Sequence, residues 1–195
     1  MGGLLSLRKE ESHFAGSHLL DPEDGSYNIN YVKNYLDASK IQIIHWVQRE
    51  QGLIVPKGNP YHIESLDDIV KQKIRFVNRQ RGSGTRILLD YYLNKLNLNK
   101  DDVIGYQLEE FNHLSVAVAI ESGKADVGLG IQAAATALGL DFVPMFCEQY
   151  DLIVPKHIFE SQKFAPVLEA MENEDFRQRV QSLRGYSVQD MGQIV

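Results

Sequence analysis

The feature that most constrains this chain is a regular alternation of extended and helical segments between residues 65 and 146. Expected strands at residues 74–78, 103–106, 126–130 and 142–146 alternate with helices expected to begin at Ser65, Thr85, Asn112 and Ile131. Strands separated by helices of about ten residues favour right-handed βαβ units and a parallel sheet covered on both faces. We therefore expect an α/β protein.

Two similar passages flank this block, and each ends in Val-Pro. Residues 41–47 and 51–56 are expected to form two extended segments joined by a bend, and residues 149–154 resemble residues 52–56 in sequence. Such a pair, entering and leaving the block, would serve as hinge strands. We expect a single domain, residues 1–195, with two lobes. Lobe I is formed by residues 1–55 and 147–195, and lobe II by residues 56–146.

Composition excludes several classes of function. The net charge of −6 gives no general attraction to a phosphate backbone or an anionic membrane, so we expect no direct nucleic-acid contact and no membrane contact. The single cysteine, Cys147, can form no internal disulfide, and no CxxC or Cys/His cluster indicates a metal site. The chain shows no export signal. We expect a cytoplasmic protein that holds no metal and no cofactor.

The most informative stretch is residues 79–86, Arg-Gln-Arg-Gly-Ser-Gly-Thr-Arg, between an expected strand and an expected helix. Ser83 is expected to cap the helix, so that Gly84 and Thr85 present backbone N–H groups at the positive end of the helix dipole. This arrangement is typical of anion binding. A capped helix surrounded by solvated arginines is the alternative interpretation.

Further side chains are candidates for the same ligand. Arg79, Arg81 and Arg86 add positive charge, and at least one of them is expected to reach an anion with a forked pair of hydrogen bonds. His113 is expected at the start of another helix, at the same sheet edge, and ligands of open α/β sheets collect beyond the carboxyl ends of the strands. It would donate to an anion or act as a pH-sensitive latch. The alternative is a histidine that is exposed or satisfied by Glu110.

Other motifs give weaker evidence of function. The loop at residues 79–86 lacks the lysine of a P-loop and the Gly-x-Ser-x-Gly spacing of a nucleophile elbow. Residues 128–133 fit the dinucleotide fingerprint G-x-G-x-x-A, with Glu148 at the distance of a ribose-binding acid, but tight helix packing explains the same residues. No nucleophile beside a base and no paired carboxylates stand out. We therefore expect a domain that is not an enzyme.

The chain resembles the type 2 periplasmic-binding-protein-like domain that is attached to molybdopterin-biosynthesis proteins and to helix-turn-helix transcription regulators, and that is related to the substrate-binding domain of LysR-type regulators. The segments that carry the resemblance are His18-Leu19-Leu20-Asp21, Tyr27-Asn28, residues 48–53, residues 78–86, residues 113–130, residues 139–144 and residues 148–152.

The resemblance implies two α/β lobes, joined by hinge strands, that close on a small ligand. The expected ligand is an oxyanion such as molybdate or tungstate, or a molybdopterin-related compound. The Ser-Gly-Thr helix start of the family falls on Ser83, Gly84 and Thr85, with Arg79, Arg81 and His113 in support. The expected function is ligand binding or sensing, linked to molybdenum cofactor metabolism or transcription regulation. The alternative is a component of a molybdopterin-biosynthesis enzyme that holds a pterin or molybdenum substrate.

One departure from the family pattern concerns the N-terminal lobe. Domains of this kind usually begin with a strand, a helix and a second strand, and this earlier material is absent before Gly2-Gly3-Leu4. The N-terminal lobe is therefore expected to be truncated, with an exposed sheet edge that a partner would cover. We expect a homo-oligomer, and a fused or separate DNA-binding or molybdopterin-biosynthesis module as a further partner.

Overall fold

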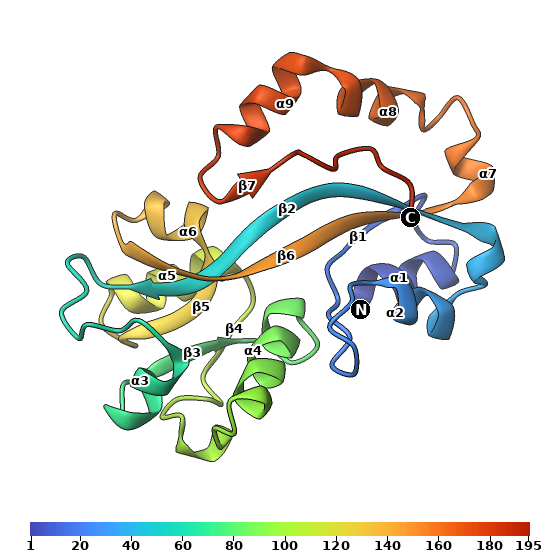
Figure 1. The fold of residues 1–195 in the computed structure, drawn as a ribbon. Coiled ribbons are helices and arrows are strands. Elements are labelled where there is room, and N and C mark those ends of the chain that lie inside the picture. Colours follow the sequence, from blue (N-terminus) through green and yellow to red (C-terminus); the bar gives the residue numbers. More distant parts are fainter. The chain divides into compact units, whose positions relative to one another are not determined.

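Two long strands organise the chain: β2 (Ile41–Val55) and β6 (Asp141–Pro155). In the computed structural model, which describes residues 1–195, the strand order is β1-β6-β2-β5-β3-β4, and β7 pairs with β2 (Figure 1). The bend expected within residues 41–56 is wrong. Gln48 pairs with Ser187 and Gln51 pairs with Ile131, so ladder partners keep this stretch extended as one strand.

The chain forms two compact units and passes between them within β2 and β6. Unit 1 consists of Met1–Arg49 and Glu148–Val195, and unit 2 consists of Glu50–Cys147. None of the helices is both long enough and apolar enough to cross a membrane.

Unit 1 surrounds the first part of β2 and the last part of β6 with helices. Its other elements are α1 (Gly2–Arg8), β1 (Ala15–Ser17), α2 (Ile29–Tyr35), the 3-10 turn Ala38–Lys40, α7 (Lys156–Phe159), α8 (Ala165–Glu172), α9 (Glu174–Gln181) and β7 (Tyr186–Ser187). Strand β1 is antiparallel to β6, with Gly16 opposite Leu152. The apolar core joins strand residues such as Ile44 and Val154 to Phe164 and Met171 of the C-terminal helical segment.

Unit 2 contains the expected alternation of strands and helices. Its other elements are α3 (Leu66–Lys71), β3 (Phe76–Arg79), α4 (Gly84–Lys95), the 3-10 turn Lys100–Asp102, β4 (Glu109–Glu110), α5 (His113–Glu121), β5 (Val127–Ile131) and α6 (Gln132–Ala137). Strand β3 is parallel to β4 and to β5, whereas β2 is antiparallel to β5. The sheet is therefore mixed, and only its βαβ part is parallel.

The strand expected at residues 103–106 is wrong. The Tyr106 N–H donates to the Val103 carbonyl at 3.1 Å, and Gly105 adopts a left-handed φ of +86° between them. A Cβ at Gly105 would lie 2.1 Å from the Phe76 carbonyl oxygen, so only glycine allows this close crossing. The chain turns here, although the Ile104 and Leu108 carbonyls accept from the Phe76 and Asn78 N–H groups of β3, and the strand ladder with β3 is formed at Glu109–Glu110.

Strand β5 is covered on both faces. A Cβ at Gly128 would lie 2.6 Å from Val116 Cγ1 of α5, so the glycine lets this helix approach closely. Because side chains alternate along a strand, Val127 and Leu129 point to the opposite face, where they are also buried. Gly128 and Gly130 thus lie inside a paired strand, opposite Ile54 and Gly52, rather than in the turn that a dinucleotide-binding fingerprint requires.

Candidate functional site: the first turn of α4

The candidate site lies at the carboxyl edge of the parallel strands of unit 2. Arg79 ends β3, and α4 begins at Gly84 after a short turn; Glu110 ends β4, and α5 begins at His113. Since β3 and β4 are parallel, their carboxyl ends lie at the same edge. The N-termini of α4 and α5 both start from this edge, which is where open α/β sheets bind ligands.

Local chemistry explains the turn before α4. The Ser83 N–H donates to the Gln80 carbonyl at 3.2 Å, and exposed Gly82 between them has a φ of +80°. Ser83 caps the helix, because its Oγ accepts from the Arg86 N–H at 3.2 Å. Gly84 and Thr85 then occupy the first two helical positions, whose N–H groups have no carbonyl partner within a helix. The predicted cap is confirmed, and α4 begins at Gly84, one residue before the expected start at Thr85.

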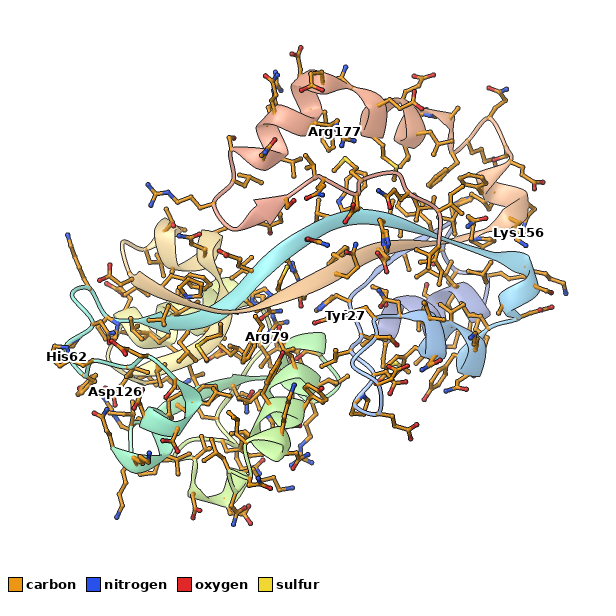
Figure 2. All side chains as sticks on the ribbon, viewed as in Figure 1. Tyr27, His62, Arg79, Asp126, Lys156 and Arg177 are labelled. Carbon is orange, nitrogen blue, oxygen red and sulfur yellow. The ribbon has the colours of Figure 1, made fainter.

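Arg79 is held beside this turn (Figure 2). Its Nε donates to Gln80 Oε1 at 3.1 Å, and its Nη2 donates to the Phe111 carbonyl at 3.2 Å. The guanidinium therefore bridges the turn before α4 and the segment before α5. This places a positive charge at the edge where both helices begin.

Arg81 has different partners from Arg79. Its side chain is 77% exposed, its Nη2 donates to Gln107 Oε1 at 3.1 Å, and its Nε lies 3.7 Å from a Glu109 carboxylate oxygen. The charge of Arg81 is therefore shared with Glu109. The side chain of Arg79 contacts the turn through Gln80, whereas that of Arg81 contacts Gln107 and Glu109.

Thr85 and His113 face the interior of unit 2. Thr85 is 1% exposed, and its Oγ1 accepts from Gln51 Nε2 at 3.0 Å. His113 is the first residue of α5, and a Cβ at Gly130 would lie 3.5 Å from its Nδ1, so its ring lies against β5. Ser83 and Arg79 form the more accessible part of the candidate site, whereas Gly84 is buried like Thr85.

The role of Gln51 and the burial of Arg86 were not anticipated from the sequence. Gln51, fully buried, supports Thr85 from β2, but it lies where the sequence suggested a bend and carries no local signal. In the sequence, Arg86 is one of several basic residues of the loop. In the structure, only 4% of it is exposed. A helical position three residues after the cap gives no sign of whether its side chain faces solvent or the core.

Unit 1 contains a separate buried polar cluster. Glu148 is 1% exposed; its Oε2 lies 3.1 Å from His18 Nδ1, and its Oε1 accepts from Arg49 Nε. Burial alone would raise the pKa of Glu148, but His18 and Arg49 outweigh it and lower this pKa to about 2. The Tyr150 ring stacks on His18 at 5.3 Å, and the Arg49 guanidinium lies 4.9 Å from the centre of the Tyr150 ring.

A second part of the unit 1 cluster centres on Asn28. Its φ is +64°, which is strained for a residue with a side chain, and it is 1% exposed. Its Oδ1 accepts from the Leu19 N–H at 2.8 Å, and its Nδ2 donates to Asp151 Oδ2 at 2.7 Å. The other oxygen of Asp151 accepts from Gln149 Nε2 at 2.9 Å. With the bond from Asn28 Nδ2 to the Ser17 carbonyl of β1 at 3.2 Å, these bonds hold β1, the start of α2 and β6 together.

Similar proteins agree with this architecture. The model of the PBP superfamily domain matches residues 1–172. The chain is 36% identical over 195 residues to the uncharacterized protein YvgK of Bacillus subtilis, and the match spans the whole chain but only 63% of that protein.

Solved structures share the fold at low sequence identity. One is a protein from Clostridium perfringens with bound phosphate, described as a phosphate ABC transporter substrate-binding protein; the TM-score is 0.64 at 11% identity, over 93% of this chain and 81% of that one. Another is the substrate-binding domain of a Clostridium difficile protein described as a molybdenum ABC transporter, with a TM-score of 0.61 at 16% identity over 95% and 83%. The chain belongs to the PBP superfamily and has the α/β fold of the type 2 periplasmic-binding proteins.

Proposed function

We propose that this chain binds a small oxyanion at the first turn of α4, without catalysing a reaction. The observation that carries the proposal is the turn itself. It combines two helix-start N–H groups, the Ser83 hydroxyl and the Arg79 guanidinium at one edge of unit 2. A helix N-terminus attracts negative charge, and an arginine fork matches the oxygens of an oxyanion.

The carboxylates of this edge do not outweigh the positive groups, because each has a basic partner. Glu109 lies within ion-pair distance of Arg81 and Arg86, and Glu110 pairs with Lys124 at 3.1 Å. A positive potential at the turn therefore persists despite two neighbouring glutamates. This balance favours an anion over a neutral or cationic ligand.

Two structural neighbours support the same chemical class of ligand. Phosphate is bound in one of them, and the other is described as a domain of a molybdenum ABC transporter. We propose molybdate or tungstate as the ligand. The output would be transcription regulation or molybdenum cofactor metabolism, in a cytoplasmic homo-oligomer. The chain spans 63% of the length of its Bacillus subtilis relative.

Thermal unfolding with an oxyanion panel tests the proposal. We expect molybdate, tungstate, sulfate or phosphate to raise the unfolding temperature of the chain in a saturable manner, while chloride at equal ionic strength does not. Arg79→Met should abolish the rise. Arg75→Met is the matched control: it removes an equal charge at the other end of β3, where Arg75 pairs with Asp126. Equal responses of the two variants, or no saturable rise in the unsubstituted chain, would contradict the proposal.

A further inference from the structure

Arg86 is a buried arginine in an electrostatically unfavourable place. It lies in the first turn of α4, three residues after the Ser83 cap, and only 4% of it is exposed. A cation near a helix N-terminus opposes the helix dipole, and a buried charge must recover its lost hydration through close partners. A residue kept under both conditions requires a compensating set of contacts.

The contacts of Arg86 join three elements of unit 2. Its Nη1 donates to the Arg79 carbonyl at 3.3 Å, at the end of β3, and lies 3.4 Å from Glu109 Oε1 of β4. Its Nε lies 3.5 Å from Asp90 Oδ1, one turn further along α4. Its guanidinium stacks 3.9 Å from the centre of the Tyr106 ring, and the Tyr106 hydroxyl donates to Asp90.

We propose that Arg86 is a positioning residue that orders the turn at residues 80–85 and thereby sets the geometry of the oxyanion site; this inference rests on the proposed function. The bond to the Arg79 carbonyl fixes the direction in which the chain leaves β3. That direction determines where the Arg79 guanidinium lies relative to the Gly84 and Thr85 N–H groups. The side chain of Arg86 itself faces the core and does not touch the ligand.

The surrounding charges show that Arg86 acts through geometry rather than through its own field. Arg81 and Arg86 together face Glu109 and Asp90, so that two positive charges meet two negative charges. Little net field from this group reaches the turn. A lysine at position 86 keeps the charge but lacks the planar fork that contacts the Arg79 carbonyl, Glu109 and Tyr106 together. We therefore expect that lysine does not replace arginine here.

Arg75→Met is a control at the opposite end of the same strand. Arg75 precedes β3 and Arg79 ends it, and Arg75 donates to both oxygens of Asp126, the residue before β5. At about 3.3 Å per residue, the four residues of β3 separate the two ends by about 13 Å. This exceeds the screening length of about 8 Å in physiological salt. Loss of Arg75 removes a charge without disturbing the turn.

The experiment compares unsubstituted protein with Arg86→Lys, Arg86→Met and Arg75→Met in two measurements. Calorimetric titration with sulfate and with molybdate, well below the unfolding temperature of every variant, gives the affinity. We expect both Arg86 variants to bind about tenfold more weakly or worse, since small misplacement of an oriented site has large effects. The affinity of Arg75→Met for the anion should stay within about twofold of that of the unsubstituted protein. Amide hydrogen exchange without any anion should accelerate at residues 80–85 in the Arg86 variants alone.

The outcomes separate this inference from the proposed function. Arg86→Lys with full affinity and unchanged exchange at residues 80–85 would overturn it. So would exchange that rises evenly over unit 2, because Arg86 would then only stabilise the core. If the unsubstituted protein binds neither anion while exchange still rises selectively at the turn, the proposed function fails and the ordering role of Arg86 stands.

Discussion

The buried polar cluster of unit 1 and the first turn of α4 in unit 2 use similar residues for different purposes. In unit 1, Glu148 lies between His18 and Arg49, so negative and positive groups meet inside the protein. At the turn, backbone N–H groups and the Arg79 guanidinium collect on one edge with the nearby glutamates already paired. Removing one partner of a buried charge destabilises a fold, whereas hydrogen-bond donors that gather at the N-terminus of a helix attract an anion.

Of the changes considered, loss of the Glu148 carboxylate has the largest expected effect on the free energy of unfolding. Glu148→Ala leaves the half-buried Arg49 and His18 without their shared acceptor, and breaking a buried pair costs about 3–5 kcal/mol of unfolding free energy. Urea unfolding at pH 7 measures this. Exposed Glu160→Ala, in the same unit, should change the unfolding free energy by less than about 0.5 kcal/mol. A Glu148 variant as stable as the Glu160 variant would show that the cluster is not structural.

The pH dependence of stability sharpens the same point. The pKa of Glu148 is lowered from 4.5 to about 2 in the folded state, so its contribution is complete above the unfolded pKa and is lost as pH falls from 4.5 to about 2. This amounts to about 3 kcal/mol. Unfolding free energies measured between pH 7 and pH 2 should therefore fall more steeply for the unsubstituted chain than for Glu148→Gln. Parallel curves would contradict this pairing.

A test in unit 2 probes packing instead of polarity. In Gly128→Ala, the new methyl group would lie 2.6 Å from Val116 Cγ1 and 2.8 Å from the Val77 carbonyl oxygen. Such overpacking costs about 1–3 kcal/mol, measured by thermal or urea unfolding. Gly2→Ala, where the new Cβ meets no atom within 4 Å, is the control. Full stability of Gly128→Ala would mean that α5 does not approach β5 this closely.

The smallest expected change in stability concerns the turn itself. Asparagine and aspartate cap helices about as well as serine, so Ser83→Asn and Ser83→Asp should unfold within about 0.5 kcal/mol of the unsubstituted chain. Aspartate, however, places a negative charge at the turn and should abolish binding of sulfate or molybdate. The Ser83→Asn variant should bind the anion at least about tenfold more tightly than the Ser83→Asp variant. Equal anion affinities of the two variants would place the anion elsewhere.

Local chemistry made the start of α4 predictable. Ser83 is a strong cap and Gly82 supplies the left-handed turn before it, and both signals act within a few residues. The long strand β2 was not predictable, because residues 48–51 stay extended through partners at Ser187 and Ile131, far away in sequence. The turn at Gly105 depends in the same way on the distant Phe76 carbonyl.

The candidate site was predictable only in part, for the same reason. The helix-start N–H groups follow from sequence, but the orientation of each arginine depends on partners that the fold supplies. Arg79 reaches the Phe111 carbonyl, Arg81 reaches Glu109, and Arg86 is buried against Tyr106. Three arginines within eight residues thus have three different surroundings.

The most direct measurement is an NMR titration of isotope-labelled protein with molybdate or sulfate, observed at the backbone amides. The account predicts that the Gly84 and Thr85 amide signals shift saturably with a common dissociation constant, and that Arg79→Met removes these shifts. Amide signals of Gly84 and Thr85 that stay unchanged at saturating anion, or that move equally with chloride, would contradict it.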